Sequence, residues 1–281
     1  MNAIYSVMDA LLPFECFRYS FMKNALLAML LLTPLLSLLG TMAVNHRMAF
    51  FSDALGHSAL AGVGIGLMLG QTNVTLSLLV FGVVFALLIT RINHVDSASK
   101  DTTISVFSSM GISLGLLILS WGGKFSAYSA LLTGDILAIG QTDLLYLLIG
   151  LVAGVAVWVV MYNALLMSAV NPELARSRGA RTDLVEYAFV VLVAVAVMLS
   201  IRWVGVLLIN ALLILPAAAA RNVARSTAQH ALLSVIFGVS SGVAGLVASY
   251  QLDTGVGAAV VLCAGIIYLV TLLLRRLTNR M

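Results

Sequence analysis

The chain has 281 residues, of which 62% are hydrophobic and only 9% are charged, and its formal net charge is +4. Water-soluble domains carry about 25% charged residues, so this composition, with a mean hydropathy of +1.10, excludes an ordinary soluble protein. The basic residues gather near the ends of apolar segments, where they act as orientation signals for membrane insertion, so the positive charge does not indicate a nucleic-acid partner.

Apolar segments of spanning length follow one another along the whole chain. A hydrocarbon core about 30 Å thick is crossed by roughly 20 apolar residues in helical form. The nine expected spans are residues 24–43, 48–70, 75–91, 103–121, 141–166, 185–201, 204–220, 231–250 and 255–274. The connections between them are too short for a soluble domain. We therefore predict an all-α fold, in which residues 1–281 form a single polytopic transmembrane bundle, with a short interfacial or re-entrant helix at 124–139.

Lys and Arg in the connections predict the orientation of the bundle, because cytoplasmic loops are enriched in them. One set of alternate connections holds eleven of these residues and the opposite set holds four. This places the C-terminus and the loop at 171–183 in the cytoplasm. Nine spans then put the N-terminus outside, although Arg18 and Lys23 just before the first span argue against that.

The second expected span contains a carboxylate and an imidazole. Asp53 lies six residues beyond Arg47, which puts it about 9 Å into the membrane, and His57 lies about 15 Å in. An ionised carboxylate at such a depth costs at least about 2.5–3.5 kcal/mol, so it needs a partner, water or an ion. The i, i+4 spacing places both side chains on one helical face, and their oxygen and nitrogen atoms suit Zn²⁺, Mn²⁺ or Fe²⁺. The alternative is an Asp–His hydrogen bond that only ties helices together.

The far side of the same span carries Gly62, Gly66 and Gly70 at intervals of four residues. Stripes of this kind allow helices to approach closely. We expect the glycines to pack on a neighbouring helix while the aspartate and histidine face a cavity. The letters GVGIG also suggest a nucleotide-binding loop, but they lie within a span and follow no strand, which excludes that interpretation.

The segment NPELARSRGART, at 171–182, predicts a short helix on the cytoplasmic side. Asn171 caps its start, Pro172 occupies the first helical position and Gly179 ends it. Such a helix suits docking to a soluble partner, and an ordinary basic loop is the alternative. The later stretch VGVLLINALLILPAAAARNVAR indicates only close helix packing.

The remaining polar residues are predicted to lie near the helix ends. Asp135 and Asp143 are expected at the outer surface, where they could contact a delivering protein, and Asp253 is expected to cap the last span. Three histidines are expected in solvated loops rather than as ligands: His46, His94 and His230.

Three segments in this order resemble a known family. HRMAFFSDALGHSALAGVGIGLMLG, NPELARSRGA and GVLLINALLILPAAAA are similar to signatures of the ABC-type zinc/manganese/iron permeases, and the resemblance covers about residues 20–275. It implies a bundle similar to the importers of vitamin B12 and siderophores. It also implies two permease copies around a central path in the bacterial cytoplasmic (inner) membrane, ATPase subunits on the cytoplasmic side and an extracellular or periplasmic metal-binding protein.

The resemblance assigns roles to particular residues. Asp53 and His57 match motif positions on the transport path, which contact the metal in passage. Glu173, Ala175 and Gly179 match positions of the coupling loop, which contacts the ATPase.

The chain departs from many relatives next to both path residues. Ser52 stands where many of them have Gly, and Gly56 stands where they have Ser or Ala. Neither change removes a ligand, but Gly56 loosens the helix beside the expected ligands. The letters HSAL favour zinc over manganese or iron.

The predicted function is a permease subunit that imports a first-row divalent metal ion. The chain has no phosphate-binding loop, so ATP hydrolysis would belong to a partner, and we expect neither enzymatic activity nor a permanently bound cofactor. A self-contained, proton-coupled secondary metal carrier is the alternative. An intramembrane enzyme would need a fuller metal motif such as H-E-x-x-H, which this sequence lacks.

Overall fold

The structure is a computed structural model that describes residues 5, 19–95, 99–128, 130–177, 179 and 181–278. Every regular element in these ranges is helical, which confirms the predicted fold class. The helices are α2 (Ser20–Asn45), α3 (Phe51–Met68), α4 (Val74–Val95), α5 (Lys100–Trp121), α6 (Phe125–Tyr128), α7 (Ala130–Thr133), the 3-10 turn η2 (Ile136–Ala138), α8 (Gln141–Val170), α9 (Pro172–Ser177), α10 (Thr182–Val223), α11 (Thr227–Leu252) and α12 (Val256–Thr278). Three of the basic residues used to predict the orientation lie outside the described ranges: Arg18, Arg178 and Arg280.

A helix covers each of the nine predicted spans, but the spans and the helices do not match one to one. Seven described helices are long and apolar enough to cross a membrane: α2, α4, α5, α8, α10, α11 and α12. The helix α3 is not among them, because Asp53 and His57 lower its hydropathy. The 42 residues of α10 cover two predicted spans, and a straight helix of that length would reach about 63 Å, twice the thickness of the hydrocarbon core.

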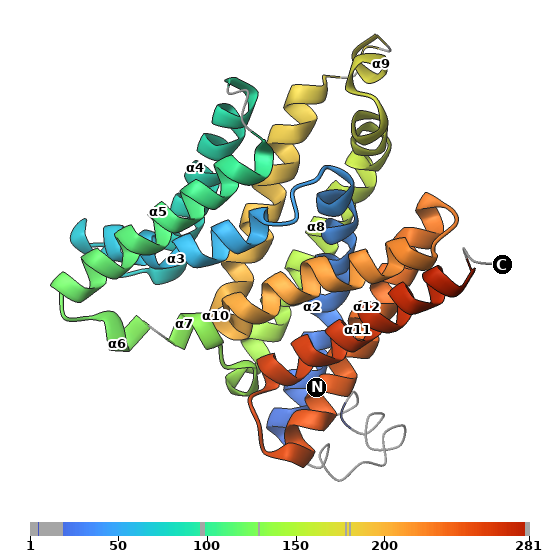
Figure 1. Cartoon of the computed structure of the whole chain (residues 1–281). Helices are drawn as coiled ribbons and strands as arrows, with labels where there is room; N and C mark the ends of the chain where they lie inside the picture. The colour runs from blue at the N-terminus through green and yellow to red at the C-terminus, as the bar shows by residue number, and fades with distance from the viewer. Residues whose placement is uncertain are drawn as a thin grey trace.

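A break at Gly205 divides α10. This residue has φ 77° and ψ 161°, a conformation outside the helical region that glycine adopts without steric penalty. Figure 1 shows the two halves of α10 leaving the break in different directions. The expected spans 185–201 and 204–220 leave only residues 202–203 for a turn between them, but the helix runs through Arg202 and breaks three positions later, at Gly205.

The segment between α7 and η2 packs directly against this break. A Cβ atom added to Gly205 would lie 2.4 Å from the carbonyl carbon of Thr133, and one added to Gly134 would lie 2.3 Å from the backbone nitrogen of Gly205. Two glycines therefore allow backbone to meet backbone where α10 bends. The mildly apolar segment 124–139, which was predicted to form one short helix, instead holds three short helical pieces, with one end against α10.

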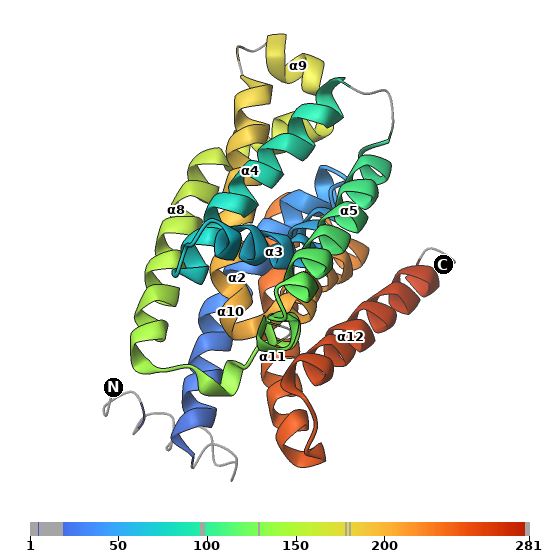
Figure 2. The same ribbon diagram turned by 90° about the vertical axis from the view of Figure 1, so that its left-hand side faces the viewer.

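The helix α3 crosses the molecule at a steep angle to α8 and to the first half of α10, and both views show it (Figures 1 and 2). It packs against α5, α4 and α10. The predicted glycine contact is confirmed for Gly62 and Gly66, where an added Cβ atom would lie 2.9 Å from Phe81 and 2.2 Å from the Ser77 hydroxyl of α4. It is wrong for Gly70, which lies beyond the end of α3 in a turn with φ 73° and open space around it.

Two of the three histidines expected in solvated loops are enclosed by the fold. His230 is only 7% exposed and its Nε2 lies 2.9 Å from the carbonyl oxygen of Ala217. His46, in the turn after α2, has its Nε2 atom 3.1 Å from the carbonyl oxygen of Leu165. Burial lowers the pKa of His46 below its usual range, although the hydrogen bond acts in the opposite sense. Backbone carbonyls near helix ends hold both rings, so the prediction of solvated residues is wrong for them.

The third histidine belongs to a charged cluster at the end of the molecule that carries α9. Glu186 of α10 accepts a hydrogen bond from Nζ of Lys100 at 2.7 Å, and its other oxygen lies 3.4 Å from Nε2 of His94. These three residues, called the Glu186 cluster below, join the end of α4 and the start of α5 to α10. Figure 1 shows α9 at the upper end of the molecule, well away from α6 and α7.

Candidate functional site

A cavity of about 780 Å³ opens beside the break in α10. Its walls come from α3, α5, the α7–η2 segment, the second half of α10 and the start of α12. Most of the lining is apolar or glycine. Its polar residues are Asp53, His57, Thr133, Asp135, Asn210 and Thr254. Neither lysine nor arginine is among the described residues that line it, so the cavity carries carboxylate charge without a fixed cation.

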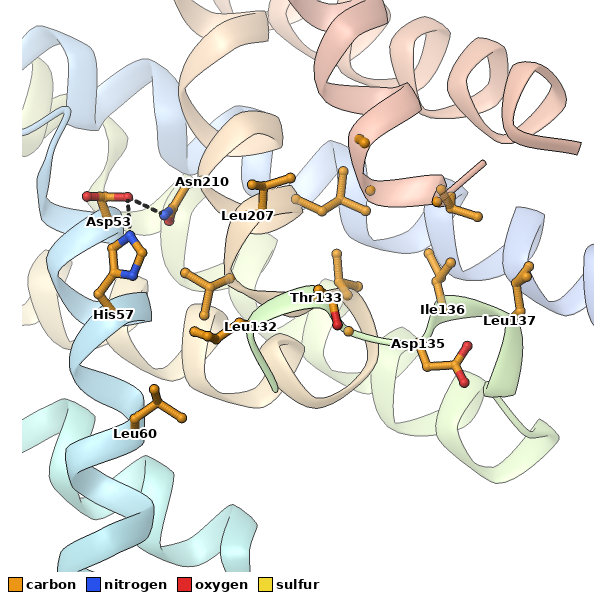
Figure 3. Close-up of a pocket in the computed structure, with 18 of the residues that line it drawn as sticks. Asp53, His57, Leu60, Leu132, Thr133, Asp135, Ile136, Leu137, Leu207 and Asn210 are labelled. Carbon is orange, nitrogen blue, oxygen red and sulfur yellow. Dashed lines mark hydrogen bonds and ion pairs between the residues drawn. The ribbon is translucent and has the colours of Figure 1, made fainter. Parts of the chain in front are cut away.

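Asp53 and His57 face this cavity from successive turns of α3 (Figure 3). Oδ1 of Asp53 lies 3.3 Å from Nε2 of His57, and 44% and 37% of the two side chains are exposed. The prediction that the pair shares one helical face is confirmed. Asp53 also lies in the first turn of α3, where free backbone N–H groups favour a negative charge.

A third residue, Asn210, joins this pair from the second half of α10. Its Nδ2 atom donates a hydrogen bond of 2.7 Å to Oδ1 of Asp53 (Figure 3). Its own Oδ1 atom is buried and has no hydrogen-bond partner in the described part of the chain. Sequence reasoning missed this residue, because an asparagine in an apolar span was taken as a sign of close packing only. The available signal was the need of such a side chain for a polar partner in the membrane.

The close approach of α3 to α10 depends on Gly56. A Cβ atom at this position would lie 2.5 Å from Cγ1 of Val206. The absence of that atom lets the turn carrying Asp53 and His57 come within reach of Asn210. The departure from the family pattern at residue 56 therefore has a packing reason in this chain.

Asp135 lines the same cavity but lies apart from the pair (Figure 3). It is exposed and belongs to the connection between α7 and η2. Among the residues that the structure describes, no three His, Cys, Asp or Glu side chains gather at one point. Structural zinc sites are closed by four protein ligands, so the pair on α3 is an open arrangement rather than a cage.

The residues predicted to couple to an ATPase lie far from this cavity, on and after α9 (Figure 1). The backbone nitrogen of Glu173 donates to Oδ1 of Asn171 at 3.0 Å, which confirms the predicted cap. Ala175 is fully buried, Glu173 is exposed, and Gly179 forms an exposed turn with φ 81°. The side of α9 that carries Ala175 is therefore packed inside the protein, whereas the side that carries Glu173 is exposed.

Comparison with known proteins identifies the family to which this chain is similar. The ABC 3 transport family matches residues 18–275. The membrane protein ZnuB of the high-affinity zinc uptake system of Haemophilus influenzae is 32% identical over 252 residues, which cover 89% of this chain and 96% of ZnuB. The membrane protein MntC of the manganese transport system of Listeria monocytogenes is 28% identical over 256 residues, which cover 91% of each chain.

Solved structures agree with this result. PsaBC from Streptococcus pneumoniae, in complex with Fab, superposes with a TM-score of 0.79 at 26% identity, covering 96% of this chain and 95% of that chain. A metal-chelate type ABC transporter in an inward-facing conformation superposes with a TM-score of 0.69 at 15% identity, covering 89% of this chain and 84% of that chain, which shows a shared fold only.

Proposed function

The chain belongs to the ABC 3 transport family, and on that premise we propose that it is the membrane permease subunit of an ABC importer for a first-row divalent metal ion. The ion is zinc in preference to manganese or iron, and it moves into the cytoplasm. The observation that carries this proposal is the Asp53–His57 pair, which faces a cavity without a fixed cation.

The chemistry of the pair suits such a cargo. A carboxylate oxygen and an imidazole nitrogen form a ligand set of intermediate hardness, which fits Zn²⁺, Mn²⁺ and Fe²⁺ better than copper(I) or Ca²⁺. Two protein ligands leave most of the coordination shell to water. This suits a transport site, which must bind strongly enough to admit the ion and weakly enough to release it.

The relatives include systems for both ions, since ZnuB belongs to a zinc system and MntC to a manganese system. The preference for zinc rests on the sequence around His57. Selectivity among these ions depends on delivery and availability as well as on ligands.

The partners follow from the same proposal. A cytoplasmic ATPase docks on the loop at about 171–183 and contacts Glu173, Ala175 and Gly179. A second copy of the permease completes the path and brings a second Asp53–His57 pair to it. An extracellular or periplasmic metal-binding protein delivers the ion, and the chain spans the bacterial cytoplasmic membrane as one domain surrounded by lipid.

A proton-coupled secondary carrier is the second candidate, since Asp53 and His57 could both exchange protons. The exposed face of α9 favours the ABC importer, because a self-contained carrier needs no docking helix. The two candidates differ in their source of energy, which makes them separable.

The decisive measurement is metal uptake into proteoliposomes that contain the permease and its ATPase. We expect uptake of Zn²⁺ or Mn²⁺ to require ATP and to be lost when Glu173→Ala and Gly179→Val are combined. Glu173 is exposed, and Gly179 lies in an exposed turn with φ 81°, where valine would strain only that turn, so the bundle should still fold and bind metal. Uptake that follows a proton gradient and survives these substitutions would establish the secondary carrier instead.

A further inference from the structure

The two polar atoms of the Asn210 amide have different surroundings. Nδ2 donates to Asp53, whereas the carbonyl oxygen Oδ1 is buried and has no hydrogen-bond partner among the described residues. Buried acceptors are nearly always paired, so this unpaired oxygen, on a residue that lines the cavity, is available to a ligand that the amide meets in another state.

A half turn about the Cβ–Cγ bond exchanges the two ends of the amide. In this structure the N–H end faces Asp53, because two oxygen atoms so close would repel each other. A dication bound to Asp53 and His57 reverses this preference, since it repels the N–H dipole and attracts the carbonyl oxygen. The same side chain can therefore stand in for the cation when it is absent and bind it when it is present.

We propose that Asn210 is a third ligand of the transported cation and presents its amide oxygen after this half turn. The inference rests on the proposed function and adds a ligand to the site. The resulting set is one carboxylate oxygen, one imidazole nitrogen and one neutral amide oxygen, which remains suited to Zn²⁺ and Mn²⁺.

This assignment has a structural consequence. Asp53 and His57 belong to α3, whereas Asn210 belongs to the half of α10 beyond Gly205. Binding of the ion would replace a hydrogen bond between the two helices with coordination from both. Loading and release would then alter the contact between α3 and the second half of α10.

The alternative is that Asn210 only positions the carboxylate through its N–H group. Two substitutions separate these roles. Asn210→Leu removes the donor and the acceptor at similar size, so it weakens binding under either role. Asn210→Asp keeps an oxygen ligand but cannot act as an amide donor, so a loss of binding in this variant would exclude the ligand role.

The experiment measures binding of Mn²⁺ by electron paramagnetic resonance, and of Zn²⁺ by competition, to the full-length permease in lipid nanodiscs at neutral pH. For Asn210→Leu we expect the affinity to fall by about tenfold or more, since even supporting partners of metal ligands have effects of this size. Asn210→Asp should stay close to wild type. If Asn210→Leu does not fold, Asn210→Ala replaces it with the same expectation.

Asn222→Leu is the matched control. Asn222 lies on the same half of α10, and its Nδ2 atom donates to the Thr271 hydroxyl of α12 at 3.3 Å, away from the cavity. This variant should bind metal normally. Asp53→Ala is the control for the site itself and should abolish binding.

The outcomes are distinct. Normal binding by Asn210→Leu together with loss in Asp53→Ala would overturn the ligand role and leave the proposed function standing. Equal losses in Asn210→Leu and Asn210→Asp would also overturn it, in favour of a positioning role. Normal binding by Asp53→Ala would remove the proposed metal site as a whole.

Discussion

Two carboxylates in this molecule each lie beside a histidine, yet their third partners differ. Asp53 is 3.3 Å from His57 and accepts a 2.7 Å hydrogen bond from the neutral amide of Asn210. Glu186 is 3.4 Å from His94 and accepts a 2.7 Å bond from the ammonium group of Lys100. The distances are nearly equal, so the difference lies in charge.

Charge decides what each group can bind. The ammonium group neutralises Glu186 and fills the position that a metal ion would take. The amide carries no charge and so does not neutralise Asp53, and a carboxylate without a fixed cation beside it attracts a dication strongly in an apolar cavity. A histidine beside a carboxylate is therefore not enough to indicate a metal site. The Glu186 cluster is a clamp that ties α10 to the end of α4 and the start of α5, whereas the Asp53 site is open to an ion.

The largest effect should come from removing the charge of Asp53. Asp53→Asn keeps the size of the side chain and its ability to accept a hydrogen bond, but it cannot offset the loss of water around a dication. We expect uptake of Zn²⁺ and Mn²⁺ into proteoliposomes to fall by more than about tenfold. This loss should exceed the roughly tenfold effect of removing a residue that only supports a metal ligand. His57→Ala should cause a comparable loss or shift the preference towards ions that favour oxygen.

A folded Asp53→Asn protein is needed for this conclusion, so its gel-filtration profile and thermal unfolding should match wild type. Normal uptake by both Asp53→Asn and His57→Ala would mean that the pair only ties the structure together. The difference in charge between the Asp53 site and the Glu186 cluster would then have no bearing on metal transport.

The second prediction converts the open site into a copy of the closed one. Asn210→Lys places an ammonium group where the amide now contacts Asp53, so the site should resemble the Glu186 cluster. We expect the affinity for the metal ion to fall by about tenfold or more, although Asp53 and His57 both remain. Titration of Mn²⁺ against the protein in nanodiscs measures the loss.

Leu207→Lys is a useful control, because Leu207 lines the same cavity from the same half of α10. It adds the same charge without the contact to Asp53, so its effect should be smaller and should weaken as salt is added. Equal losses in the two variants would show that general repulsion, rather than neutralisation of Asp53, controls binding.

Much of the fold and part of the site could be predicted from the sequence, because those features depend on local order. Apolar runs predicted the helices, and the i, i+4 spacing predicted that Asp53 and His57 share a face. Asn171, Pro172 and Gly179 predicted the short helix at α9 in the same way.

The missed features depend on contacts between distant segments. Asn210 lies 157 residues from Asp53, and no spacing rule connects them. The break at Gly205 depends on the backbone of Gly134, which packs against it. His230 was expected in solvent because it lies near a helix end, but its ring is buried against the carbonyl of Ala217, thirteen residues earlier in the chain.

The smallest effect should come from the Glu186 cluster. Glu186→Gln keeps the shape of the side chain but leaves Lys100 without its ionic partner. Only 17% of the Glu186 side chain is exposed, but 39% of the Lys100 side chain is, so solvent screens part of the interaction. We expect the free energy of unfolding to fall by about 1 kcal/mol, near the upper end for ion pairs that water reaches, as measured by thermal or denaturant unfolding.

The same variant should bind Mn²⁺ with wild-type affinity, because α10 separates Glu186 from Asn210 by more than six helical turns and a break at Gly205. A substitution of Arg176 is the control for stability. The side chains of Arg176 and Asp183 are both more than half exposed, so a protein without this ion pair should lose even less stability. A several-fold loss of metal affinity in Glu186→Gln would contradict the separation of the two regions. It would mean that the end carrying α9 controls the cavity through α10 even without an ATPase, and the clamp would then be part of the transport mechanism.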